Sequence, residues 1–187
     1  YLIILFSIIG FGYLSSKILS IRFSLGELGL SGILFMTILS YITNLAFPHN
    51  FIHNSIFLVL GLITCFSLLR KKLFRKRIKL ILIISSVLFV GILMYKTHDD
   101  FFYYHFSYTV SLIEFKKIFG LGNLEHGFRT PSSIFYFNSL FYLPIFEKSL
   151  INSGAIFFLI FTNIFLIQKI FNQLKNKKND FILILSL

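Results

Sequence analysis

The stretch that decides the fold is Phe51–Lys79, which reads FIHNSIFLVLGLITCFSLLRKKLFRKRIK. Its first part, Phe51–Leu69, contains no Asp, Glu, Lys or Arg, whereas Arg70–Lys79 contains seven Lys or Arg residues. A helix needs about 20 mostly apolar residues to cross the hydrocarbon core of a bilayer, and Lys and Arg beside such a run are typical of cytoplasmic loops. The stretch therefore predicts a membrane-spanning helix followed by a cytoplasmic connection.

Similar apolar runs lie on both sides of this stretch. They are Tyr1–Leu19, about Leu28–Phe47, about Leu80–Tyr95 and about Ala155–Ile170, and Phe181 begins another. Only 13% of the residues are charged, against about 25% in an ordinary soluble domain. We expect an all-α fold, a polytopic transmembrane helix bundle with four spans in residues 1–95. Residues 154–187 would add a fifth span, a cytoplasmic basic loop and the start of a sixth, in what we interpret as a fragment of a larger protein.

The basic residues predict the topology. Thirteen of the eighteen Lys and Arg residues fall near three span ends, in 17–22, 70–79 and 169–178, while 96–148 balances five basic against five acidic residues. The positive-inside rule then places residues 96–153 in an extracytoplasmic, periplasmic loop. The Phe, Ile, Lys and Asn-rich composition is typical of an AT-rich bacterial genome, so we expect a multi-pass protein of the bacterial inner membrane. Since the basic residues lie in short loops, nucleic acid is not an expected partner despite the net charge of +11.

One apolar segment, Ser133–Phe146, is too short to span. It has about 14 residues, includes Asn138 and is broken by Pro144, which favours an interfacial or re-entrant helix. A span here would also place the basic cluster after the next helix outside the cell, against the charge rule. Its aromatic residues suit the headgroup layer of the membrane; they are Phe135, Tyr136, Phe137, Phe141 and Tyr142.

The extracytoplasmic loop opens with a pair of aspartates, Asp99 and Asp100, followed by helix-like spacing over 101–119. One interpretation is structural: an aspartate caps a juxtamembrane helix that Gly120 ends. The other is functional: an aspartate takes a proton from an acceptor hydroxyl, or the pair holds a divalent cation beside a lipid phosphate. The residues alone leave both open.

One tyrosine and one histidine that follow the aspartates, Tyr104 and His105, are further candidates. If a helix starts at residue 101, Asp100 lies near Tyr104 at i+4 and His105 lies one step further, so all three would border one cleft. His105 could orient a carboxylate, bind a phosphate oxygen or simply occupy a helix face. His98 and His126 could join the aspartates around a metal, but the sequence has no recognised zinc-ligand spacing.

A glycine-rich turn, GLGNLEHGFRTPSS over residues 120–133, forms the second polar element. It lacks the spacing of a dinucleotide or P-loop motif, so it is either an ordered turn leading into a helix capped by Ser132 or Ser133, or a binding loop. Arg129 is the best anion-binding candidate because its guanidinium can bind a phosphate bidentately. A contact with lipid headgroups is the alternative role for Arg129.

These motifs resemble a family of large bacterial multi-spanning proteins. The resemblance lies in Asp100 with Tyr104-His105, in the Gly-Leu-Gly-Asn turn at 120–123 and in the run 127–143, and it covers about residues 97–143. That family is similar in layout to the GT-C class of membrane glycosyltransferases, in which an acidic residue of an outer loop acts on a polyprenyl-phosphate sugar. The sequence departs from the family pattern in doubling the aspartate and in placing Glu125 before His126.

The resemblance implies transfer of a sugar from a polyprenyl-phosphate donor to an extracytoplasmic glycan or lipid. Asp100 or Asp99 would be the catalytic base, or both would hold a divalent cation, the only cofactor we consider. Substrate-binding residues would be His105, Tyr104, Arg129, Asn123 and His126. Two other classes stay open: a transporter or flippase, for which Glu27 at a span end is the nearest candidate, and a structural membrane subunit.

Overall fold

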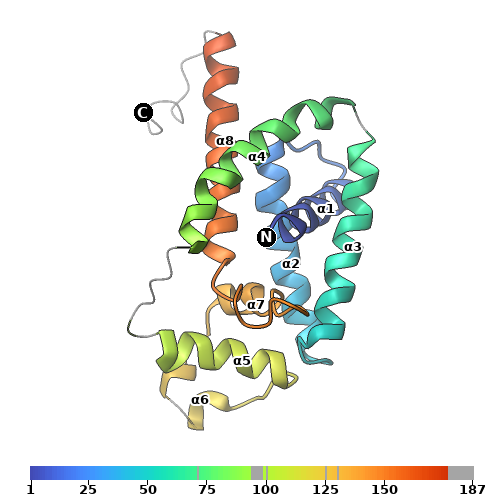
Figure 1. Cartoon of the computed structure of the whole chain (residues 1–187). Coiled ribbons are helices and arrows are strands. Elements are labelled where there is room, and N and C mark those ends of the chain that lie inside the picture. The colour runs from blue at the N-terminus through green and yellow to red at the C-terminus, as the bar shows by residue number, and fades with distance from the viewer. Residues whose placement is uncertain (71, 94–98, 100, 125, 130, 177–187) are drawn as a thin grey trace.

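The computed structural model describes residues 1–70, 72–93, 99, 101–124, 126–129 and 131–176. This part of the chain is 76% helical and contains no strand, so the all-α class is confirmed (Figure 1). The elements are α1 (Leu2–Ile18), α2 (Leu25–Asn44), α3 (Phe51–Leu69), α4 (Lys72–Leu93), the π-helix η1 (Phe101–His105), α5 (Phe106–Glu114), α6 (Leu121–Leu124), the 3₁₀ turn η2 (His126–Phe128), α7 (Ser133–Ser139) and α8 (Gly154–Asn176).

Three helices are long and apolar enough to cross a membrane. They are α2, α3 and residues 154–174 of α8, and each leaves large apolar side chains exposed, such as Leu34, Ile63 and Phe158. In α1 and in residues 78–91 of α4 the apolar helix is shorter. The sequence therefore predicted the apolar helices correctly, while complete spans for α1 and α4 remain predictions.

Glycines allow α1 to pack closely against its neighbours. A Cβ atom added to Gly10 would clash with the backbone of Gly61 in α3, and one added to Gly12 would clash with the backbone of Leu28 in α2. Small residues let helix backbones approach closely, which is the usual basis of helix association where water does not drive apolar contact. The first three helices thus form one tightly packed unit.

Glu27, the candidate for a transport site, caps a helix. It completes a capping box with Ser24: the Ser24 backbone N–H donates to Glu27 Oε2 at 2.6 Å, and the Glu27 N–H donates to Ser24 Oγ at 3.4 Å. The neighbouring Gly26 N–H donates to Gln168 Oε1 of α8 at 3.0 Å. These contacts give Glu27 a structural role at the start of α2.

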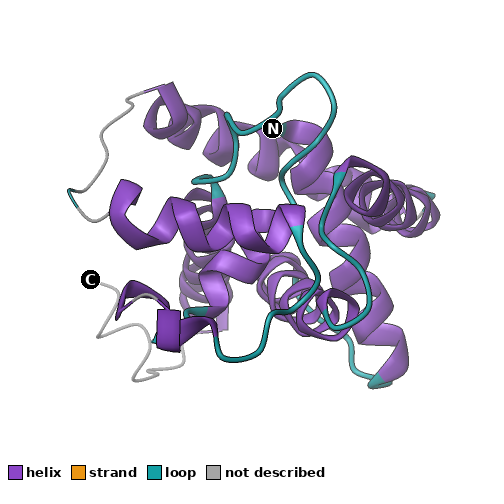
Figure 2. Ribbon diagram, turned by 90° about the horizontal axis from the view of Figure 1, so that it is seen from below, coloured by secondary structure: helices purple, strands orange, loops and turns teal. Residues whose placement is uncertain are grey.

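The polar segment and the basic clusters lie at opposite ends of the molecule. The starts of α2 and α4 and the C-terminal end of α8 lie at the upper end in Figure 1, whereas η1, α5, α6 and α7 lie at the lower end. We call the described residues within 99–153 the cap. Seen from the cap end, α5 lies across the ends of the long helices (Figure 2).

The helix expected over residues 101–119 is shorter than predicted. It forms a π-helical turn and then α5, which ends at Glu114, because Phe115 adopts an extended backbone with φ −128° and ψ 149°. Asn44 of α2 causes this end: its Nδ2 donates to Leu112 O at 3.2 Å and to Phe115 O at 3.4 Å, and its carbonyl accepts the Lys117 N–H at 2.8 Å. Gly120 has a left-handed φ of +80° but lies outside the helix.

The segment expected at the membrane interface is instead packed inside the protein. Its helical part, α7, ends at Ser139 and is followed by turns. Four of its five aromatic side chains are buried, and Tyr142 is half-buried; the buried ones are Phe135, Tyr136, Phe137 and Phe141. Because α7 contacts α2, α5 and α8, these rings form the core between cap and bundle, and the interfacial role predicted for them is wrong.

Candidate functional site

A buried polar junction fixes the cap to the bundle. Asn54 of α3 is fully buried, and its Nδ2 donates to three backbone carbonyls, those of His49 at 2.7 Å, Ser139 at 2.8 Å and Tyr142 at 2.9 Å. His49, also fully buried, shares a hydrogen bond of 2.6 Å between its Nδ1 and Ser139 Oγ. The chain before α3 and the chain after α7 are thus joined by groups that water does not reach.

The imidazole of His49 is neutral in this junction. Burial, with a smaller contribution from the neighbouring ring of His53, lowers its pKa from 6.5 to about 3, although a backbone hydrogen bond at Ser40 acts in the opposite direction. Its backbone N–H donates to Leu112 O of α5 at 2.9 Å. His49 therefore holds three segments together as an uncharged group.

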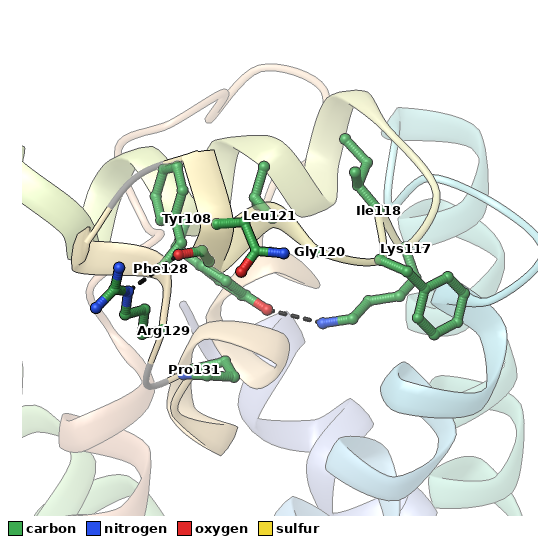
Figure 3. A pocket seen from close by; sticks show the side chains of 11 residues that line it. Tyr108, Lys117, Ile118, Gly120, Leu121, Phe128, Arg129 and Pro131 are labelled. Atoms are coloured by element: carbon green, nitrogen blue, oxygen red, sulfur yellow. Dashed lines mark hydrogen bonds between the residues drawn. The ribbon is translucent and has the colours of Figure 1, made fainter.

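The cap contains a pocket of about 350 Å³ between α5, the segment 117–123 and residues 128–131 (Figure 3). Two cationic side chains, Lys117 and Arg129, line it together with Tyr108 and the Gly-Leu-Gly-Asn turn. Among the described residues that line this pocket, none is acidic. We call it the cationic pocket, because its charge suits an anionic ligand.

Two buried phenols hold the ammonium group of Lys117. Its Nζ donates to Tyr108 OH at 2.9 Å and to Tyr136 OH at 2.6 Å, and both tyrosines are at most 3% exposed. Burial lowers the pKa of Lys117, but the hydrogen bonds to the phenols outweigh burial and raise it overall. Burial also raises the pKa of Tyr136 to about 12. Lys117 therefore stays charged, and one of its three N–H donors is left for a ligand.

Arg129 is held by the glycine turn. Its Nε donates to Gly122 O at 3.2 Å (Figure 3), and a Cβ added to Gly122 would lie only 3.1 Å from Arg129 Cα. The Asn123 N–H donates to Gly120 O at 2.9 Å, which closes the turn around the left-handed Gly120. The predicted turn is confirmed, and it leaves the terminal N–H groups of the exposed guanidinium available to bind an anion.

His105 lines a second pocket, of about 210 Å³, with Thr109, Ser132, Asn138 and Asn152. Its ring lies 5.2 Å from that of Phe135, centroid to centroid, and Phe135 lies 5.5 Å from the ring of Tyr108 in the cationic pocket. The ring of Phe135 thus lies between His105 of this pocket and Tyr108 of the cationic pocket. His105 therefore lies in a different pocket from Arg129 and Asn123, which the sequence had also named as substrate-binding residues.

Tyr104 lies at the contact between η1 and η2. The Tyr104 ring lies 4.3 Å from that of His105, and a Cβ added to Gly127 would lie 2.7 Å from Tyr104 Cβ. His126 is exposed and does not line the cationic pocket. Of the predicted substrate-binding residues, Arg129 and Asn123 come together, His105 and Tyr104 contact each other, and His126 stands apart.

Only one of the two aspartates belongs to the described part of the chain. Asp99 is exposed in a turn before η1, whereas Asp100 and His98 lie outside the described residues. Within the described part of the chain, no three His, Cys, Asp or Glu side chains come together as a metal site would require. The cleft of Asp100 with Tyr104 and His105, and a cation held by the aspartates, therefore stay predictions.

The sequence did not predict the contacts of Lys117 in the cationic pocket or the residues of the junction. It placed Lys117 only as part of the helix expected over residues 101–119, and it gave no role to Tyr108 or to the junction residues His49 and Asn54. The available signal was the Pro-His-Asn connection at 48–50, which has polar residues but no Lys or Arg between two apolar runs. Such a connection suits burial against another part of the protein.

Comparison with known protein families identifies the chain. A model described as "Domain of unknown function (DUF8201)" matches residues 1–187, so the chain belongs to this family. Comparison with curated proteins and with solved structures found no match.

Proposed function

We propose that this chain is part of a GT-C-like membrane glycosyltransferase of the bacterial inner membrane. It would transfer a sugar from a polyprenyl-phosphate donor to an extracytoplasmic glycan or lipid. The observation that supports this proposal is the cationic pocket, in which Lys117 and Arg129 face one cavity beside a tight glycine turn. The cap that contains this pocket lies at the end of the bundle opposite the basic clusters, as an extracytoplasmic site requires (Figure 1).

The pocket suits the phosphate of such a donor. Arg129 offers a planar fork of donors and Lys117 offers a fixed ammonium, and together they match the charge of a phosphate. Amide and phenol groups at Asn123 and Tyr108 could orient its remaining oxygens. The hydrogen bonds of Lys117 to two buried phenols fix the ammonium before a ligand arrives, which reduces the entropic cost of binding.

The proposed reaction gives each group a definite task. An acceptor hydroxyl attacks the anomeric carbon, the bond from that carbon to the phosphate oxygen breaks, and the lipid phosphate leaves with the electron pair. Lys117 and Arg129 stabilise the charge that develops on the leaving phosphate. Asp100 or Asp99 accepts the proton of the hydroxyl. Alternatively, the two carboxylates would hold a divalent cation that makes the hydroxyl more acidic, and its proton would pass to water.

The test compares surface glycans in cells that lack the native gene. The cells express the wild-type protein, the Lys117→Met variant or an Asp99→Asn/Asp100→Asn double variant at matched membrane levels, and the glycans are compared by mass spectrometry. We expect a glycan that depends on the wild-type protein to disappear in the double variant and to fall about tenfold with Lys117→Met, because a hydrogen bond to a charged group contributes roughly 1.5–3 kcal/mol.

Lys116→Met is the matched control. Lys116 is the neighbouring lysine, but it is exposed and does not line the pocket, so its replacement should leave the glycan unchanged. If cells without the protein, cells with the wild type and cells with any of the three variants all carry the same glycans, the transferase is rejected and a transport or structural role is favoured.

A further inference from the structure

Apolar side chains form an exposed lip beside the cationic pocket. Phe115, Ile118 and Phe119 are 53%, 40% and 81% exposed, and Leu45 and Phe47, just after α2, are 58% and 62% exposed. Ile118 and Phe119 also line the pocket, so the lip borders its opening. We call these five residues the lip.

The lip lies where a candidate membrane span ends. Asn44, the last residue of α2, donates through Nδ2 to Phe47 O and Phe115 O, both at 3.4 Å, and its carbonyl accepts the Lys117 N–H. Asn44 is thus hydrogen-bonded to both segments that form the lip, the one after α2 and the one after α5. Because α2 is long and apolar enough to cross the membrane, this position corresponds to the interfacial layer of the bilayer.

The charges beside the lip suit a bilayer that contains anionic lipid. Lys116 and Lys117 lie in the same segment, and the nearest carboxylate along the described chain is the exposed Glu114. Lys near a membrane surface directs its ammonium to the headgroups, while neighbouring Phe and Leu side chains enter the acyl boundary. The lip has this combination of cations and apolar side chains.

We infer that the lip inserts into the interfacial layer of the outer leaflet, so that the cationic pocket opens to the bilayer and takes its ligand from there. The ligand is then an anionic lipid whose phosphate binds Lys117 and Arg129 and whose chain lies along the lip. The identity of this ligand as a substrate rests on the proposed function, whereas the insertion of the lip does not.

The chain offers a matched pair of positions for the test. Leu124 in α6 is as exposed as Phe119, at 81%, but α6 lies on the side of the cap away from the long helices (Figure 1). The sequence contains no Trp, so Phe119→Trp and Leu124→Trp each give this chain a single tryptophan. Neither position is buried, so both variants should fold.

The experiment measures the indole fluorescence of each variant in phosphatidylcholine vesicles. Insertion predicts that Phe119→Trp emits at shorter wavelength than Leu124→Trp and is quenched by chain-brominated phosphatidylcholine, while Leu124→Trp is quenched by aqueous iodide. At equal bromine content, brominated phosphatidic acid should quench Phe119→Trp more strongly than brominated phosphatidylcholine. Adding Lys117→Met should remove this excess quenching, and adding Lys116→Met should leave most of it.

Each part of the inference can be overturned without a transferase assay. Quenching of the Phe119→Trp fluorescence by iodide, or its protection from both quenchers, would rule out insertion of the lip. Equal quenching by the two brominated lipids, or an excess that Lys117→Met does not change, would rule out recruitment of the anionic lipid by the pocket. If the quenching results support insertion and lipid recruitment but no glycan depends on the protein, only the proposed reaction is rejected.

Discussion

Two polar regions, the junction between cap and bundle and the cationic pocket of the cap, differ in burial and in hydrogen bonding. In the junction, His49 and Asn54 are fully buried, and their polar groups bind backbone carbonyls or Ser139. In the cationic pocket, Lys117 and Arg129 border an open cavity and keep donors that no described residue uses. Buried polar groups with complete hydrogen bonds stabilise a fold, whereas accessible charges with spare donors are suited to bind a ligand.

The largest effect should come from breaking the junction. Asn54→Ala removes buried hydrogen bonds to the carbonyls of His49 and Ser139 and a part-buried one to that of Tyr142. Unsatisfied buried groups each cost about 1–3 kcal/mol, so we expect a loss of roughly 3 kcal/mol in the free energy of unfolding. Thermal unfolding in detergent measures this loss. Asn163→Ala, which removes only an exposed bond to Leu159 O within α8, should cost under about 0.5 kcal/mol. Equal losses would contradict a special role for the junction.

Acidification should weaken the same junction. His49 has a folded pKa of about 3 against 6.5 when unfolded, so below pH 6.5 the unfolded chain binds the extra proton and the folded chain does not. The folded state therefore loses stability as pH falls, by about 1.4 kcal/mol per pH unit, or roughly 2 kcal/mol between pH 6.5 and 5.

This window lies above the usual pKa values of Asp and Glu, so carboxylates contribute little to the slope. Unfolding free energies measured at pH 7, 6 and 5 provide the test, with His126→Gln as a control because His126 is exposed. A stability that stays constant down to pH 5 would show that His49 is not held neutral by burial.

The contact between η1 and η2 should show a smaller effect. In Gly127→Ala the new Cβ would lie 2.7 Å from Tyr104 Cβ, and relief of such overpacking costs about 1–3 kcal/mol. Gly91→Ala in α4 is the control and should raise the free energy of unfolding, because alanine favours a helix more than glycine does. Its Cβ would meet only Ile156 Cδ1 at 3.7 Å and Cγ1 at 4.0 Å, which are ordinary contacts. A Gly127→Ala protein as stable as wild type would show that this contact can adjust freely.

The smallest expected effect is that of Gly122→Ala, which should weaken ligand binding without changing stability. The Cβ of Gly122→Ala would lie 3.1 Å from Arg129 Cα and 3.3 Å from its Cγ, so Arg129 should shift by a few tenths of an ångström. We expect phosphatidic acid binding, measured by native mass spectrometry, to weaken about threefold, or roughly 0.6 kcal/mol, while thermal stability stays nearly constant. An unchanged affinity would argue that the position of Arg129 does not matter for the ligand.

Local patterns in the sequence predicted much of the fold. The apolar run Phe51–Leu69 has the bounds of α3, and the Gly-Leu-Gly-Asn spacing correctly predicted the turn at Gly120. Both depend on properties of neighbouring residues: apolar length in the first case and backbone freedom in the second. Such features can be inferred from a few consecutive residues.

Features set by distant residues could not be predicted in this way. Helix α5 ends at Glu114 because Asn44, about 70 positions earlier, binds the carbonyls of Leu112 and Phe115. Lys117 then lies outside the helix and reaches Tyr108 and Tyr136. The cationic pocket is a product of these long-range contacts, which is why Arg129 was predicted and Lys117 was not.

The most direct test of the central claim is the affinity of the purified full-length protein for phosphatidic acid, measured by native mass spectrometry in wild type, Lys117→Met and Lys116→Met. We expect Lys117→Met to weaken binding about tenfold, equivalent to about 1.4 kcal/mol, while Lys116→Met stays within about twofold of wild type. Equal affinities in all three proteins, or equal losses in the two variants, would contradict the assignment of the cationic pocket as a binding site for a lipid phosphate.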